Sequence, residues 1–283
     1  MSKKALCVGI NKYPVLDGKD ISLRGCVNDA MAWADLLVNH YDFANVTLLL
    51  DDQATKTKMI EGLKNLLLGA QAGDVLVFTN SSHGTYVIDN DDDEIKTVWM
   101  GQYDQAICPY DCKDNLLIDD EIRELLYDLP ADVQLTVISD SCHSATVTKA
   151  IIKAQPSSIV PPDDRRPRLL PPEWLGFRAI NSARETPEIT SIIKKSKYPE
   201  SEMKEILLSG CKRMQSSFDA AIKGKYHGAM TYFAIESIKA AGYKLTYQEL
   251  YDMYLNDFED KYSYNQQPQL EGTDANKQRQ LFT

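Results

Sequence analysis

A cysteine and a histidine, each directly after a predicted strand, are the side chains with the clearest chemical potential. Residues 133–139 mix β-branched and apolar types without Gly or Pro, and the polar run DSCHS follows, with its cysteine at 142. Residues 74–79 form a second apolar run, followed by NSSHG, with its histidine at 83. Both runs are typical of buried strands. Open α/β sheets carry functional residues at their carboxyl edge, so Cys142 and His83 meet there if the strands are parallel neighbours.

A cysteine with an imidazole within reach is the minimal apparatus for covalent acyl transfer. In that interpretation His83 lowers the pKa of the Cys142 thiol and then protonates the leaving amine. The backbone N–H groups near Gly84 and at Cys142 are the expected oxyanion donors, because a glycine allows close backbone approach. A lone cysteine is more often a small core residue, and a lone histidine a surface residue. Their placement at matching strand ends favours the catalytic interpretation.

Strands and helices are expected to alternate along the chain. The patterns predict strands at 4–10, 45–50, 74–81, 133–139 and 205–208, and helices at 27–40, 57–68, 122–126, 231–241 and 246–258. Such alternation is typical of parallel strands joined by right-handed helical crossovers. We therefore expect an α/β fold with a mainly parallel central sheet and helices on both of its faces.

The length of 283 residues and the 43% apolar content suit one large domain. Within it, residues 1–150 hold the cysteine and the histidine, and residues 205–283 form a smaller second part. Residues 151–204 between them are expected to be an exposed linker. Six of the twelve prolines fall within 151–172, which excludes a regular helix or central strand there.

The composition of the chain limits which partners it can bind and in which cellular compartment it is expected. The net charge of −10 argues against binding to nucleic acid or to anionic membranes, both of which need a basic surface. The short apolar run after Met-Ser-Lys-Lys does not make a signal peptide, and no apolar run is long enough to cross a membrane. We expect a cytoplasmic protein. Six cysteines are few for this length, so free thiols are the expectation.

The motifs SSHGT around His83 and DSCHSA around Cys142 resemble those of metacaspases and of their bacterial relatives, the orthocaspases, in peptidase family C14. Further stretches match in family order: ALCVGINKYP (5–14), LRGCVNDA (23–30), YDQAICPYD (103–111), IDDEI (118–122), LLSG (207–210) and QPQLEG (267–272). The resemblance implies a caspase-like fold and a cysteine endopeptidase. It also implies a monomer that needs no cofactor for its chemistry. Because the first predicted strand begins near the first residue, we expect no adaptor prodomain.

The resemblance also implies the substrate class. Metacaspases and orthocaspases cleave after Arg or Lys and hold the basic side chain with acidic pocket residues. Those residues correspond here to Asp29 and Asp140, and Ser81 matches a further pocket position. Converging carboxylates suit a guanidinium, so cleavage of polypeptides after Arg, with Lys second, is expected. The alternative is that Asp29 is an ordinary helix N-terminal acid and Asp140 a turn residue.

Calcium dependence is left open by the sequence. Asp104, Asp119 and Asp120 resemble positions that bind calcium in many metacaspases, and carboxylate oxygens are the ligands that calcium prefers. Lys149 stands where the family has a further carboxylate, and a cation there should weaken the site. Asp119 and Asp120 equally suit the first turn of a helix.

In caspase-like proteases the segment after the catalytic cysteine is often cut. Here that segment offers Lys153, Arg165, Arg166 and Arg168 as sites for autocleavage, and the alternative is a plain surface linker. Two other classes of function stay open: a catalytically silent caspase-like scaffold, and a cysteine hydrolase of non-peptide amides. Comparing the cleavage of Arg, Lys and Asp peptides with that of small amides separates these classes.

Overall fold

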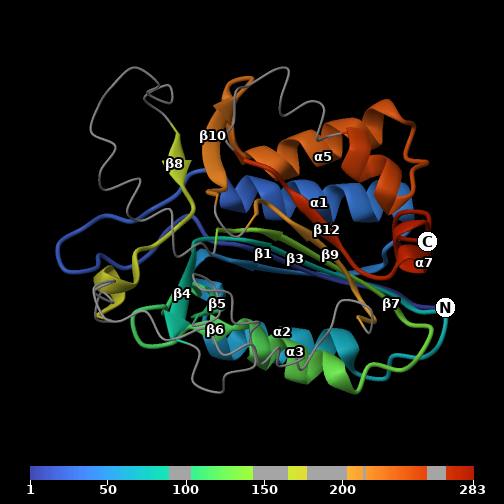
Figure 1. The fold of residues 1–283 in the computed structure, drawn as a ribbon, viewed down its shortest axis with the longest axis horizontal. Coiled ribbons are helices and arrows are strands. Elements are labelled where there is room, and N and C mark those ends of the chain that lie inside the picture. The colour runs from blue at the N-terminus through green and yellow to red at the C-terminus, as the bar shows by residue number, and fades with distance from the viewer. Residues whose placement is uncertain (89–102, 143–164, 177–202, 213–214, 254–265) are drawn as a thin grey trace, which may run out of the picture.

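A six-stranded sheet runs through the middle of the molecule (Figure 1). The computed structural model describes residues 1–88, 103–142, 165–176, 203–212, 215–253 and 266–283. In spatial order the strands of the sheet are β12 (Gln269–Glu271), β9 (Ile206–Ser209), β7 (Gln134–Asp140), β3 (Val75–Ser81), β1 (Lys3–Gly9) and β2 (Asn45–Leu50). All neighbours pair in parallel except β12, which is antiparallel to β9. The mainly parallel sheet predicted from the sequence is confirmed.

Helices cover both faces of this sheet (Figure 1). One face carries α1 (Cys26–Tyr41) and α5 (Ala229–Ala240), and the other carries α2 (Lys56–Leu67) and α3 (Asp119–Tyr127). Each face has its own apolar core. Strand β1 divides its residues between the two cores, because successive side chains of a strand point to opposite sides. Ala5 and Cys7 lie in the core that contains Trp33, whereas Leu6 and Val8 lie in the other.

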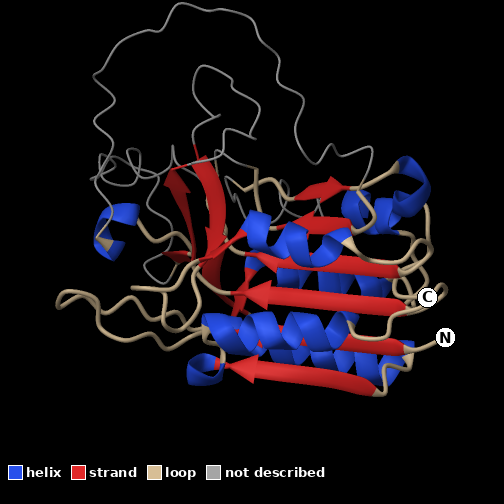
Figure 2. Cartoon of the chain, turned by 90° about the horizontal axis from the view of Figure 1, so that it is seen from below, coloured by secondary structure: helices blue, strands red, loops and turns tan. Residues whose placement is uncertain are grey.

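Two small antiparallel sheets complete the structure beside the carboxyl ends of the central strands, toward which the arrowheads point in Figure 2. One consists of β4 (Gly84–Ile88), β5 (Tyr103–Ile107) and β6 (Leu117–Ile118), and the other of β8 (Arg166–Pro167), β10 (Phe218–Ile222) and β11 (Lys225–Gly228). The β10–β11 turn has positive φ angles at both Lys223 (48°) and Gly224 (81°), as two-residue hairpin turns require. Short helices lie at η1 (Asp51–Gln53), η2 (Pro172–Leu175) and α7 (Asp274–Lys277), and residues 247–253 are helical up to the end of that described stretch.

The predicted linker is buried in part where the structure describes it. Residues 151–164 and 177–202 lie outside the described residues, but within 165–176 Arg168 is fully buried. Leu170 and Leu175 join the apolar core on the α2 face. The prediction of an exposed segment is wrong for these buried residues, because proline excludes regular helix but does not prevent an extended chain from being buried. In the described part of the chain, no helix is long and apolar enough to cross a membrane.

Candidate active site

The histidine and cysteine motifs meet at one edge of the central sheet. Strands β3 and β7 are parallel neighbours, and their register pairs Ser81 with Asp140. His83 and Cys142 each follow two residues after this pair, and both are buried. The relation between the two strands that the sequence analysis assumed is therefore present.

Two backbone N–H groups at this edge donate to the same oxygen. The N–H of Gly84 lies 2.9 Å from the carbonyl oxygen of Arg168, and the N–H of Cys142 lies 3.3 Å from it. Paired backbone donors of this kind stabilise the negative charge that develops on a carbonyl oxygen during acyl transfer. Both N–H groups thus converge on the Arg168 carbonyl oxygen, as the donors of an oxyanion site would.

The Arg168 side chain enters a pocket of carboxylates and is completely buried. Its Nη2 atom lies 2.7 Å from Asp29 Oδ2 and 3.1 Å from Asp219 Oδ1. Its Nη1 atom donates to Ser81 Oγ at 2.7 Å and to the Asp140 carbonyl at 2.9 Å, and it lies 3.4 Å from Asp140 Oδ2. The three polar residues predicted to bind a basic side chain, Asp29, Asp140 and Ser81, are brought together around a guanidinium.

The fold orients the three carboxylates through donors other than Arg168. These donors are the Gly228 N–H for Asp29, the Ser217 hydroxyl and Thr231 N–H for Asp140, and the N–H groups of Arg24 and Gly25 for Asp219. Gly228 is needed for a second reason, since a Cβ there would overlap both the Asp140 carboxylate and the guanidinium. The pocket is therefore preorganised for a planar cation.

The backbone around Arg168 is held in an extended conformation. Its N–H donates to the Ser217 carbonyl at 2.9 Å, where β8 pairs antiparallel with β10. On the other side the Leu170 N–H donates to the Gly84 carbonyl at 2.9 Å. Pairing of an extended peptide with an exposed strand edge is a common mode of peptide recognition. The segment therefore lies across the site as a bound peptide would, with the Arg168–Leu169 bond between the two contacts.

His83 has the protonation that a general base needs. Its Nε2 atom lies 2.7 Å from the Ile21 carbonyl, which can only accept, so we assign the proton to Nε2. Nδ1 then carries the lone pair, and it is buried without a hydrogen-bond partner among the described residues. Burial, reinforced by the Arg168 cation, lowers the pKa of His83 to about 4. The ring is neutral at pH 7 and able to accept a proton.

The Cys142 thiol is turned toward another acceptor. Its Sγ donates to the Gln215 carbonyl at 2.9 Å, whereas His83 Nδ1 has no partner in the described part of the chain. The two predicted catalytic groups share one edge but are not hydrogen-bonded in this arrangement. Such hydrogen bonds are often long or poorly aligned until the reaction begins. Transfer of the thiol proton to His83 requires the thiol to rotate away from Gln215.

Within the described part of the chain, the predicted calcium residues are not gathered into a metal site. Arg123 lies 3.5 Å from Asp119 Oδ2 and 3.7 Å from Asp120 Oδ1, in the first turns of α3. Asp104 lies on β5, and Lys149 is outside the described residues. Among the described residues there is no group of three or more His, Cys, Asp or Glu side chains that could hold a metal. The structure gives the calcium prediction no support, because a guanidinium already neutralises two of the three carboxylates.

The other basic residues of the predicted cleavage segment lie elsewhere. Lys153 is outside the described residues, and the Arg166 Nη1 atom donates to the Ser22 carbonyl at 2.6 Å. Arg165 is half-buried and precedes β8. Of the described residues in that segment, Arg168 is the one whose carbonyl lies on the Gly84 and Cys142 N–H groups.

Asp219 was missed by the sequence analysis. Its carboxylate is fully buried on β10 and contacts Arg168 directly. A signal was available, since a charged residue interrupts the otherwise apolar strand FDAAI. Such a residue is rarely buried without a partner.

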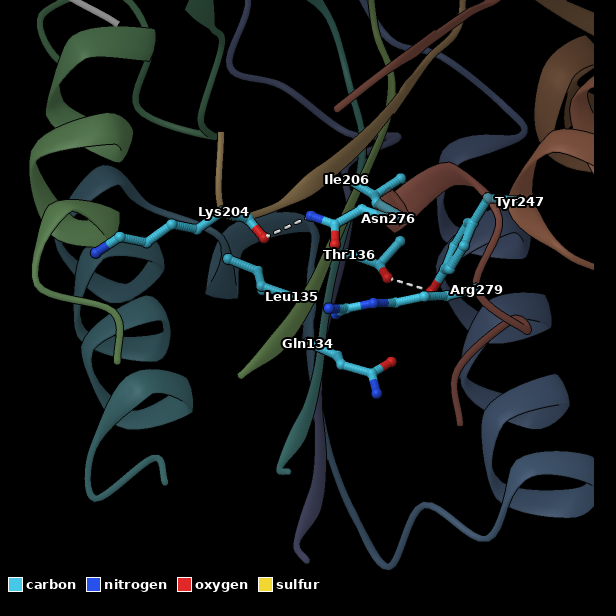
Figure 3. Close-up of a pocket in the computed structure, with 8 residues that line it drawn as sticks. All are labelled: Gln134, Leu135, Thr136, Lys204, Ile206, Tyr247, Asn276 and Arg279. Atoms are coloured by element: carbon cyan, nitrogen blue, oxygen red, sulfur yellow. Dashed lines mark hydrogen bonds between the residues drawn. The ribbon is translucent and has the colours of Figure 1, made fainter. Parts of the chain in front are cut away.

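A separate pocket, drawn in Figure 3, lies at the opposite end of the sheet. It is lined near the amino end of β7 by Gln134, Leu135 and Thr136, and the Thr136 hydroxyl hydrogen-bonds the Tyr247 hydroxyl. Strand β7 runs from this pocket to the Cys142 edge. The pocket is therefore not part of the candidate active site.

Known proteins share this architecture. The crystal structure of protein GSU0716 from Geobacter sulfurreducens superposes with a TM-score of 0.73 at 26% identity, over 100% of this chain and 99% of that one. Together with the sheet order and the helices on both faces, this likeness defines a caspase-like α/β fold. Residues 3–151 match the family model of the metacaspase, peptidase C14 domain, so the chain belongs to the metacaspase family.

Curated relatives carry the same family name. Metacaspase-8 of Arabidopsis thaliana is 37% identical over 173 residues, which cover 58% of this chain and 43% of the relative. Metacaspase-1A of Neurospora crassa is 32% identical over 301 residues, which cover 95% of this chain and 62% of the relative. The chain thus spans less than two thirds of the length of either relative.

Proposed function

We propose that this chain is a cysteine endopeptidase that cleaves polypeptides after arginine, and more weakly after lysine. Its first substrate is its own Arg168–Leu169 bond. One observation carries the proposal: the Arg168 carbonyl accepts from the Gly84 and Cys142 N–H groups while its guanidinium fills the carboxylate pocket. Among Lys153, Arg165, Arg166 and Arg168, this observation favours Arg168 as the cleavage site.

The mechanism follows from the positions of the groups. The Cys142 thiol rotates from Gln215, gives its proton to His83 Nδ1 and attacks the Arg168 carbonyl carbon. The two backbone N–H groups stabilise the oxyanion. His83 then protonates the Leu169 nitrogen, the C–N bond breaks, and Arg168 remains on Cys142 as a thioester. Water, activated by His83, hydrolyses this thioester and regenerates the thiol.

Arginine is favoured over lysine because the acceptors are spread over both terminal nitrogens. Nη2 contacts two carboxylates and Nη1 contacts Ser81 and Asp140. A lysine ammonium is a single compact cation and cannot reach both groups of acceptors at once. The same pocket blocks the site in the uncut chain, because Arg168 competes with any external substrate as a tethered ligand with a high effective concentration.

The test is to follow the purified chain and its Cys142→Ala variant by intact mass and N-terminal sequencing. We expect a fragment that begins at Leu169 from the wild type and none from the variant, with Cys7→Ala, which removes a distant thiol, as the matched control. Fluorogenic Arg, Lys and Asp peptides and a small non-peptide amide, each with calcium or chelator, then define the substrate class. Fragments that form equally in the Cys142→Ala chain would refute the proposal, as would hydrolysis of the small amide alone.

The pH dependence of self-cleavage should report the buried His83. The reaction needs the neutral ring, and a pKa lowered to about 4 keeps the ring neutral below the ordinary histidine value of about 6.5. The first-order rate of self-cleavage should therefore persist as the pH falls from 7 to about 5 and decline only near pH 4. The measurement is a pH–rate profile of the intact chain, and an acid limb centred near 6.5 would contradict it.

A further inference from the structure

A second thiol lies beside Cys142. Cys211 Sγ donates to the Gln215 carbonyl at 3.2 Å, and this is the same oxygen that accepts from Cys142 Sγ at 2.9 Å. The shared oxygen therefore holds the two sulfur atoms side by side. Neither contact is needed for peptide-bond cleavage as described above, so the presence of Cys211 at the nucleophile is not explained by that reaction.

The strand arrangement places the two backbones at a distance that suits a disulfide. Strands β7 and β9 are parallel neighbours, with Ser139 opposite Ser209, and the Gly210 N–H continues the pairing by donating to the Ser139 carbonyl at 2.8 Å. Cys142 lies three residues after Ser139 and Cys211 two residues after Ser209, so the two cysteines are offset by one residue just beyond the ends of these strands. A spacing of about 4.8 Å between strands and a rise of about 3.3 Å for one residue give about 5.8 Å, and disulfides join Cα atoms about 4.4–6.8 Å apart. Closing the bond therefore needs side-chain rotation rather than a rearrangement of the sheet.

The two thiols differ in reactivity. The neighbouring Cys142 thiol and then burial raise the pKa of Cys211 well above its usual value, so Cys211 is not the thiol that an oxidant attacks first. Cys142 is the thiol at the edge that holds the base His83. An oxidant that needs a thiolate reacts with Cys142 first, and Cys211 is then placed to attack the oxidised sulfur.

We propose that Cys142 and Cys211 form a reversible disulfide when a peroxide oxidises the protein. The inference rests on the proposed function only in taking Cys142 as the more nucleophilic thiol. The Cys142 thiolate attacks a peroxide oxygen, the O–O bond breaks, and with hydrogen peroxide the departing hydroxide leaves as water. Cys211 sulfur attacks the resulting sulfenic acid, the S–S bond forms, and hydroxide leaves with the Cys211 proton as a second water. Two thiols are oxidised by two electrons and one peroxide is reduced.

Such a bond would switch the enzyme off and protect it. The disulfide removes the nucleophile, and it stops oxidation before the sulfinic acid, which thiol reductants do not reverse. A dithiol reductant would restore both thiols. In the uncut chain Cys142 is fully buried and its N–H is held by the Arg168 carbonyl, so the reaction should be faster once Arg168 has been removed from the pocket.

The test is peptide mapping of the full chain after treatment with hydrogen peroxide and alkylation of the remaining thiols. We expect a linked pair of peptides that contain Cys142 and Cys211, with the loss of two hydrogen atoms. In Cys211→Ser and Cys211→Ala this product should be absent and Cys142 should proceed to sulfinic acid, whereas Cys7→Ala should behave as wild type. After dithiothreitol, the wild type should recover its activity on an Arg peptide, whereas the Cys211 variants should show a lasting loss.

Mapping of the wild type separates this proposal from the proposed function, because it needs neither activity nor a variant. If the wild type yields the disulfide-linked pair of peptides but cleaves no Arg peptide, the result supports the disulfide and refutes the proposed peptidase activity. An active wild type in which Cys142 becomes sulfinic acid while Cys211 remains alkylatable would overturn the disulfide alone. Thermal unfolding of the Cys211 variants before oxidation controls for loss of structure.

Discussion

Replacement of Arg168 by alanine should abolish cleavage at position 168. The alanine side chain cannot contact Asp29, Asp140 or Asp219, so the segment loses the interactions that hold its carbonyl on the Gly84 and Cys142 N–H groups. Arg168→Lys keeps one cation and should be cut more slowly than the wild type. A time course of fragment formation, with Arg166→Ala as the neighbouring control, measures the effect. Cutting of Arg168→Ala at an unchanged rate would show that the pocket does not select the bond.

The same substitution should also destabilise the fold. Arg168 is the cation shared by three carboxylates that are each fully or almost fully buried. Removing one partner from a buried ion-pair network costs about 3–5 kcal/mol, because charges are left without compensation. Urea unfolding in the Cys142→Ala background, where no cleavage interferes, measures the free energy of unfolding.

The control for this measurement is Arg166→Ala. Arg166 is half-buried, and its side chain donates to the Ser22 carbonyl, so we expect a change of about 1 kcal/mol. An equal loss of the free energy of unfolding in the two variants would mean that backbone N–H groups stabilise the carboxylates more than Arg168 does. These N–H groups belong to Gly228, Thr231, Arg24 and Gly25. The difference between the variants therefore measures what the buried cation contributes.

Some of this site was readable from the sequence because it depends on local patterns. The apolar runs that became β3 and β7 each end in small polar residues, and parallel strands share a carboxyl edge, so His83 and Cys142 were expected to meet if the two strands were neighbours, as they are. Gly84 follows the histidine directly, so its N–H had to lie at the same edge. The adjacency of the two strands was the one distant contact that had to be assumed.

The fate of Arg168 could not be read in this way. The prolines and arginines of the segment 151–172 are typical of an exposed loop. The burial of the Arg168 side chain depends on carboxylates from three separate elements. Asp29 is 139 residues away in the sequence, and Asp219 is 51 residues away. Composition reports the local preference of a segment, whereas a buried charge is decided by partners that only the tertiary fold brings together.

The β10–β11 hairpin was missed for a more local reason. Lys223 and Gly224 are both in the left-handed region, yet Lys-Gly is a weaker turn signal than Asn-Gly or Asp-Gly. Without the hairpin, Asp219 had no predicted position. The third carboxylate of the pocket therefore appeared only when the strand edge that pairs with β8 was known.

Asp219→Asn should lower the preference for arginine over lysine. Asp219 Oδ1 lies 3.1 Å from the Nη2 atom of Arg168, a position that a lysine ammonium does not reach while it contacts Ser81. Hydrogen bonds to charged groups contribute about 1.5–3 kcal/mol, so kcat/KM for an Arg peptide should fall about 10- to 100-fold. Cleavage of the corresponding Lys peptide should fall much less. The ratio of the two kcat/KM values is the measurement.

The control variant is Asp20→Asn, which removes an exposed carboxylate from the loop before α1 and should leave the ratio within about twofold. Asp219 also accepts the N–H groups of Arg24 and Gly25, so its loss could disturb the start of α1, where Asp29 lies. A disturbance of that kind would lower kcat/KM for the Arg and the Lys peptide alike and leave the ratio of the two values unchanged. Only a selective loss of arginine cleavage would assign Asp219 to recognition of the guanidinium, since that group alone extends to the β10 carboxylate.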